Sequence, residues 1–82
     1  GSIISQETLA KGYSVNDVFA TVNLIALAVG HDGALIYSWD GNNSFMLKGR
    51  LETSYAYAIK INDGDDIIYV ATEEGVEIFI IN

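Results

Sequence analysis

The loop at residues 62–66, Asn-Asp-Gly-Asp-Asp, holds the densest group of side chains in this chain that could do chemistry. Hard cations such as calcium take carboxylate oxygens as ligands, and the candidate ligands here are Asp63, Asp65 and Asp66. The loop departs from the calcium-binding pattern, because its glycine comes too early and no glutamate follows where a bidentate ligand is needed. Asn-Asp-Gly is also an ordinary turn sequence. We therefore expect a turn here, with a calcium loop as the alternative.

A second candidate is the pair His31-Asp32, which resembles half of a general-base arrangement. No nucleophile can be identified to accompany it, and Gly33 follows directly, as at the tip of a β-hairpin. We expect His31 to be an exposed turn residue. Several aromatic residues fall at strand positions, where packing is a more frequent role than ligand stacking: Tyr37, Trp39, Phe45, Tyr69 and Phe79. The sequence thus predicts no catalytic residue, no cofactor and no enzyme activity.

The composition excludes several classes of function. The chain has 82 residues, of which 4 are basic and 11 acidic, for a net charge of -7. Nucleic-acid binding needs a clustered basic surface, which so few basic residues do not supply. There is no cysteine and only one histidine, so disulfide frameworks and thiolate or multi-histidine metal sites are excluded. The longest apolar stretches fall short of the roughly 18 to 20 residues of a transmembrane helix, so no membrane is expected.

The apolar content points to self-association. Hydrophobic residues make up 50% of the chain and charged residues 18%. So short a chain buries a modest fraction of its surface, and small domains need added stabilisation, which cysteines cannot supply here. Surplus apolar surface is typical of a protein that binds other copies of itself. Residues 1–2 are typical of a remnant of tag cleavage, and no secretory signal opens the sequence, so we expect a cytoplasmic protein.

Apolar runs bounded by turn residues predict two β-hairpins. Each contains a turn that ends in glycine, at Gly33 in the first hairpin and at Gly75 in the second. The hairpins align with one residue skipped at the turn, so that Leu27 falls on Val70 and Ile36 on Ile78. Further strand candidates precede each hairpin and follow the first. The predicted strands are 17–22, 24–30, 34–39, 45–51, 56–61, 67–72 and 76–81.

An internal repeat adds one more strand candidate at the start of the chain. Residues 2–13 and 44–55 both begin with Ser and end with Tyr over the same length, which makes 3–9 the counterpart of 45–51. The match of Ser2 to Ser44 is discounted, because residues 1–2 are typical of a tag remnant. Residues 5–12 could instead form a short helix, with Ser5 as its N-cap and Gly12 at its end. The repeat favours the strand. Each unit then holds four strands in about forty residues, joined as antiparallel meanders.

Four antiparallel strands that repeat at this period resemble the blades of the β-propeller family. The marks of WD40 blades are absent from their usual places, since Gly30-His31 lies in a hairpin turn and Trp39-Asp40 ends a strand. Within the family, the chain is similar to an archaeal type whose two-blade subunits form a homohexameric, twelve-bladed ring. That resemblance implies six subunits. Propellers of four to eight blades would give three or four subunits instead.

The resemblance also assigns the parts of the chain. Residues 13–54 would form one blade and residues 55–82 three strands of a second, while residues 3–12 would supply the outer strand of a blade in the neighbouring subunit. The strand at 76–81 would otherwise present an apolar, unpaired edge. We therefore expect an all-β subunit that exchanges strands head-to-tail in a closed ring. The predicted interface residues are Ile3, Ile4, Leu9, Val76, Ile78 and Ile80.

These expectations favour a homo-oligomerisation module that displays a fused domain or a binding surface and has no catalytic activity. The alternative is a ligand- or protein-binding propeller that uses acidic loops on one face of the ring. A hydrolase or isomerase would require paired carboxylates with a nucleophile or a set of metal ligands, which the sequence does not offer.

Overall fold

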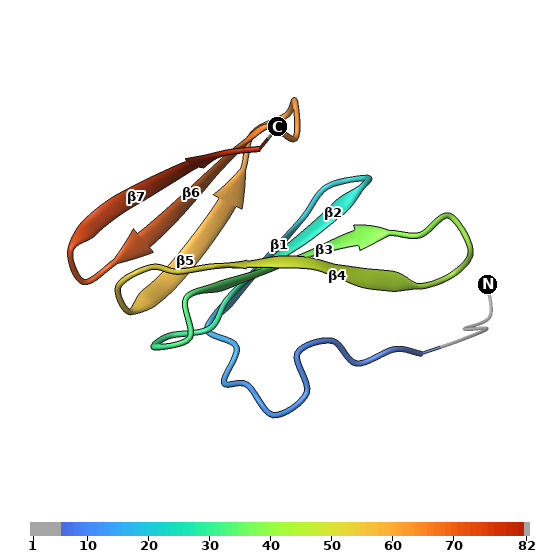
Figure 1. Cartoon of the computed structure of the whole chain (residues 1–82), viewed down its shortest axis with the longest axis horizontal. Helices are drawn as coiled ribbons and strands as arrows, with labels where there is room; N and C mark the ends of the chain where they lie inside the picture. The colour runs from blue at the N-terminus through green and yellow to red at the C-terminus, as the bar shows by residue number, and fades with distance from the viewer. Residues whose placement is uncertain (1–5, 82) are drawn as a thin grey trace.

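A computed structural model describes residues 6–81 of the chain, and these residues form two antiparallel β-sheets (Figure 1). The first sheet has the strand order β1-β2-β3-β4 and the second the order β5-β6-β7. The predicted all-β class is confirmed, and residues 6–12 are not helical. The strands are β1 (Asp17–Ala20), β2 (Leu24–Ala28), β3 (Ala34–Trp39), β4 (Phe45–Leu51), β5 (Ala56–Ile61), β6 (Ile67–Thr72) and β7 (Gly75–Ile80).

The turns follow the predicted glycines, but three strands end earlier than predicted, β1 and β2 by two residues each and β7 by one. Gly33 has a φ of 80°, and a Cβ on it would lie 2.2 Å from the carbonyl oxygen of Leu51, so this turn requires glycine. β1 stops before residue 22, because the Thr21 hydroxyl accepts hydrogen bonds from the backbone N–H groups of Asn23 and Leu24 and closes a turn. β2 stops before residue 30, because Gly30 adopts a φ of 61°.

The two sheets have the same register in their first three strands, as the aligned hairpins predict. Leu27 pairs with Leu35 in the first sheet, and the equivalent Val70 pairs with Glu77 in the second. The β1–β2 and β5–β6 ladders agree in the same way. The unit is therefore repeated in three dimensions as well as in sequence.

The main core lies between the facing sides of the two sheets, which we call their inner faces. It contains Leu24, Ala26, Ala28, Ala34, Ile36, Ala56, Ile59, Ile61, Ile68 and Val70. A backbone bridge joins the sheets at one side, where Gly30 and Ala56 exchange hydrogen bonds of 3.2 and 3.0 Å. The Asp17 carboxylate adds an acceptor for the Ile59 N–H at 3.0 Å. β5 thus lies against β1 and β2, while β4 and β7 belong to the parts of the sheets that splay apart (Figure 1).

Residues 6–9 are not a strand, so the prediction of a strand over residues 3–9 is wrong for this part of it; residues 3–5 lie outside the described residues. A strand needs a neighbour for its backbone groups, and here none pairs with it. Instead, this N-terminal segment crosses the outer face of the first sheet. Leu9 and Ala10 pack there in a second cluster with Ile25, Leu27, Val29, Leu35 and Tyr37. The Ala10 N–H donates a hydrogen bond of 3.1 Å to the Tyr37 hydroxyl.

Candidate functional site

β7 carries the edge that the sequence predicts to be unpaired. Within residues 6–81, it forms backbone pairs with β6 alone. Val76, Ile78 and Ile80 alternate along it and are 64%, 59% and 74% exposed. Their side chains lie on the side of the second sheet away from the core, which we call its outer face. Edge strands that stay unpaired usually carry charges or proline, and β7 offers an aliphatic stripe instead.

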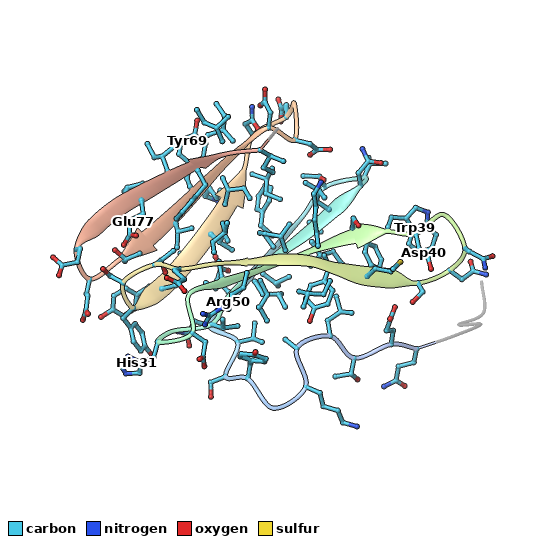
Figure 2. The ribbon with its side chains drawn as sticks, in the orientation of Figure 1. His31, Trp39, Asp40, Arg50, Tyr69 and Glu77 are labelled. Carbon is cyan, nitrogen blue, oxygen red and sulfur yellow. The ribbon has the colours of Figure 1, made fainter. Side chains whose placement is uncertain are left out.

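The stripe continues across the second sheet. Tyr69 on β6 is 38% exposed and points away from the first sheet (Figure 2). Ala58, Tyr69, Ala71 and Val76 line a shallow hollow of about 130 Å³ on this face. The outer face of the second sheet is thus mainly apolar, with the exposed Lys60 paired beside Tyr69 as a charged residue, and its apolar residues are Ala58, Tyr69, Ala71, Val76, Ile78 and Ile80.

The equivalent face of the first sheet is buried. In the alignment, Ala28, Ala34 and Ile36 correspond to Ala71, Val76 and Ile78. These three residues of the first sheet are at most 4% exposed, because the second sheet covers them. The inner face of the first sheet and the outer face of the second sheet are therefore two copies of the same repeated face. This face is covered by protein in the first sheet and exposed to solvent in the second.

The opposite kind of face also occurs twice. The inner face of the second sheet, with Val70 and Phe79, corresponds to the outer face of the first, with Leu27 and Tyr37. Leu51 on β4 packs against the inner face of the second sheet, and its repeat counterpart Leu9 packs against the outer face of the first. The N-terminal segment therefore occupies, on the first sheet, the place that β4 occupies on the second.

These observations locate the predicted interface residues in two groups. Val76, Ile78 and Ile80 are exposed on the outer face of the second sheet. Leu9 is half-buried on the outer face of the first sheet, and Ile3 and Ile4 lie outside the described residues. The two packed sheets separate the two groups, so a contact between them requires two copies of the chain.

Glu77 is a site residue that the sequence analysis missed. Its carboxylate accepts hydrogen bonds from the Thr72 hydroxyl at 2.9 Å and from the Ser54 N–H at 3.0 Å. The hydrogen bond from Thr72, and then that from Ser54, lower the pKa of Glu77. Figure 2 places it at the end of the second sheet near the β4–β5 connection. The sequence feature that could have identified Glu77 is the acidic residue at the position where the first hairpin has the apolar Leu35.

The acidic loop is a hydrogen-bonded turn, as expected. The Asn62 side-chain oxygen accepts hydrogen bonds from the N–H groups of Asp66 and Ile67, and the Asp66 carboxylate accepts one from the Asn62 amide. Asp65, at a φ of 57°, accepts a hydrogen bond of 3.2 Å from Asn23 in the neighbouring β1–β2 turn. Asp63 is exposed. Residues 6–81 contain no group of three or more His, Asp or Glu side chains placed to hold a metal ion.

His31 is an exposed residue at a hairpin tip, which confirms the expectation (Figure 2). Its ring meets that of Tyr55 edge-on, with 4.7 Å between the ring centroids. The strand aromatics are divided among different surroundings. Phe79 packs on the main core and Tyr37 on the second cluster, while Tyr69 and Trp39 stay partly exposed.

Comparison of the chain with protein-family models, with curated proteins and with solved structures gave no match. Residues 6–81 include no helix with the length and apolar character needed to cross a membrane.

Proposed function

We propose that this chain is a homo-oligomerisation module, made of two propeller blades, that assembles head-to-tail into a closed ring. The observation that carries the proposal is the repeated face, which is covered by the second sheet in one case and open in the other. A second copy would cover the open face with the outer face of its own first sheet. In this ring, the outer face of the second sheet of each copy would bind the outer face of the first sheet of the next copy.

The register within the first sheet supports a detailed form for the proposed contact. In the first sheet, Ala34 pairs with Leu51 and Ile36 with Gly49. The equivalent pairs across two copies are Val76 with Leu9, and Ile78 with Glu7 of the next copy. The N-terminal segment already lies on the first sheet in the position that β4 has on the second. A neighbouring β7 would then supply the backbone partner that residues 7–9 lack in a single chain.

Additional apolar burial supports a stable contact. Val76, Ile78 and Ile80 together would move from more than half exposed to covered. Fully burying a side chain of this size contributes about 1.5 to 3 kcal/mol before the entropy cost of association. The contact has different surfaces on its two sides, so assembly continues from copy to copy until the ring closes.

Native mass spectrometry at micromolar concentration tests this proposal. We expect a single closed species, with six chains by resemblance to two-blade subunits and three or four chains as the alternatives. A monomeric mass at that concentration would contradict the proposal. A broad series of masses without a dominant species would contradict closure.

A ring that binds a ligand or another protein through its acidic loops is the second candidate. The loop at residues 62–66 lies beside the β1–β2 turn, and its Asp63 and Asp66 are exposed. A ring would repeat these carboxylates at one end and form a negative surface suited to basic partners. Binding through these loops would require assembly, because only a ring repeats the carboxylates at one end.

A further inference from the structure

A separate hollow of about 300 Å³ lies between the N-terminal segment and the outer face of the first sheet. Leu9 and Ile25 form apolar walls, and Trp39 and Phe45 form an aromatic end, with Glu7 and Asn43 at the rim. The rings of Trp39 and Phe45 are tilted by 56°, with their centroids 5.0 Å apart. Trp39 is 42% exposed, so part of its ring remains open to a ligand.

The carboxylate of Glu7 is fixed beside this aromatic pair. It accepts a hydrogen bond of 3.2 Å from the Phe45 N–H and one of 3.0 Å from the Ser44 hydroxyl. A carboxylate can accept about four hydrogen bonds, so two positions remain for a ligand. Among residues 6–81, no Lys or Arg forms an ion pair with Glu7. Its negative charge therefore has no positive partner in the described part of the chain.

The repeat shows that packing alone does not require this chemistry. An equivalent groove lies between β4 and β7, and it is lined in part by Gly49, Leu51, Ile68 and Ile81. Their counterparts in the hollow are Glu7, Leu9, Ile25 and Trp39. Two apolar positions are kept in both. The other two change from glycine and isoleucine to an acid and an indole.

We propose that this hollow binds an alkylated ammonium group. The face of an indole or benzene ring attracts a cation, and the attraction is stronger when apolar walls displace water from the alkyl groups. The Glu7 carboxylate supplies the opposite charge, and the chain's net charge of -7 raises the local concentration of cations. The volume is at the lower end of the range for small-molecule sites, which suits a group of this size. The lining comes from one chain, and in the proposed ring the β7 edge of a neighbouring copy would lie beside Glu7 and Leu9 of this lining.

Trp39 is the only tryptophan in the sequence, so its fluorescence reports on this site alone. The probes are tetramethylammonium, choline and free trimethyl-lysine, with 3,3-dimethylbutanol as the uncharged analogue of choline. We expect saturable binding with a dissociation constant of about 1 to 10 mM and binding of the uncharged analogue at least about tenfold weaker. The ratio of the choline and trimethyl-lysine constants tells which source of the group is preferred. Equal affinity for the uncharged analogue, or no saturation up to about 100 mM of any ammonium probe, overturns the proposal.

Two variants and a matched control locate the binding. Glu7→Gln removes the charge and keeps an acceptor, and Phe45→Leu removes one ring; each should weaken choline binding about tenfold. Glu52→Gln removes an equal charge from an 87% exposed side chain outside the hollow and should leave the constant unchanged. An equal loss in Glu52→Gln and Glu7→Gln overturns the assignment. The comparison of choline with its uncharged analogue uses the unchanged chain, so it holds whether or not a variant folds. Native masses of the same samples separate any loss of assembly from a loss of binding.

Discussion

Glu77 shows how one residue distinguishes the two halves of the repeat. Its counterpart Leu35 lies in the apolar cluster beneath the N-terminal segment, whereas Glu77 binds Thr72 and Ser54. Ser54 belongs to the connection between the two sheets, so this carboxylate ties that connection to the β6–β7 hairpin. The contact between Glu77 and the connection that joins the two sheets is thus polar. The surface of β7 that would meet a second copy is mainly apolar.

Replacement of Glu77 by glutamine should reduce stability in a pH-dependent way. Because the pKa of Glu77 is lowered in the folded chain, its stabilising effect is present above the ordinary glutamate value of about 4.3 and is lost as the pH falls through the folded value. Urea unfolding at several pH values should therefore show a destabilised Glu77→Gln at pH 7 and a smaller difference from the parent at pH 3. Glu74→Gln, at an exposed turn position, is the control and should show little difference. A difference for Glu77→Gln that is equal at both pH values would contradict this role.

At the residue scale, the sequence allowed turn residues to be predicted better than site residues. Asn62 and Gly33 act locally, within a few residues of chain, so their types were sufficient. The environment of Glu77 depends on Thr72 and Ser54, which are brought together by two connections and a hairpin. The hollow at Trp39 likewise depends on a segment more than thirty positions away in sequence. Contacts of this kind follow from the fold.

Among the strands, β7 differs most from the edge strands that monomeric proteins usually have. It holds three exposed aliphatic side chains on one face and no proline or lysine, and its one charged side chain, Glu77, is already hydrogen-bonded. Edge strands of monomers usually avoid this composition, because an apolar edge pairs readily with another chain. β7 is therefore suited to a permanent partner.

A charge at the centre of β7 should prevent assembly. Ile78→Glu would place a carboxylate opposite Glu7 of the next copy in the proposed contact, where burial of the charge and repulsion between like charges should weaken association at least about a hundredfold. Light scattering should then report a monomer at concentrations where the parent is assembled. Val22→Glu is the control, since Val22 lies in the β1–β2 turn and is 89% exposed. Normal assembly of Ile78→Glu would exclude this face from the contact.

The strands themselves were largely predictable, and the exceptions have physical causes. Hairpins are local structures, and the glycine turns at Gly33 and Gly75 gave both of them. The end of β1 was missed because a hydroxyl at Thr21 competes for backbone N–H groups. Residues 6–9 were predicted as a strand because their counterpart β4 is one. β4 has β3 beside it, and residues 6–9 have no such neighbour in a single chain.

On the scale of the whole molecule, the proposed contact can be tested by cross-linking. The chain has no cysteine, so a pair introduced at Glu7→Cys and Ile78→Cys would be the only thiols present. Directly paired residues of neighbouring strands are close enough for a disulfide. We expect oxidation to give a ladder of covalent oligomers on a non-reducing denaturing gel, with its last step at the ring size. Each single cysteine variant should give no ladder beyond a dimer.

Two outcomes would contradict the arrangement of copies. An oxidised double variant that runs only as a single chain would mean that residues 7 and 78 do not meet across copies. A ladder of similar yield from a pair of Val22→Cys and Ile78→Cys would show that the contact lacks the proposed register.

The bridge between Gly30 and Ala56 has a consequence for the physical state of the protein. Its two hydrogen bonds act with the main core to hold the second sheet at one rotation from the first, and in the proposed head-to-tail assembly this rotation would be part of every step. A rotation that returns to the first copy gives a finite particle, whereas a slightly different one gives a helical fibre that grows without limit. In the proposed assembly, the packing of the two sheets at this bridge would therefore help to decide whether the protein stays dissolved as a closed particle or precipitates as a filament.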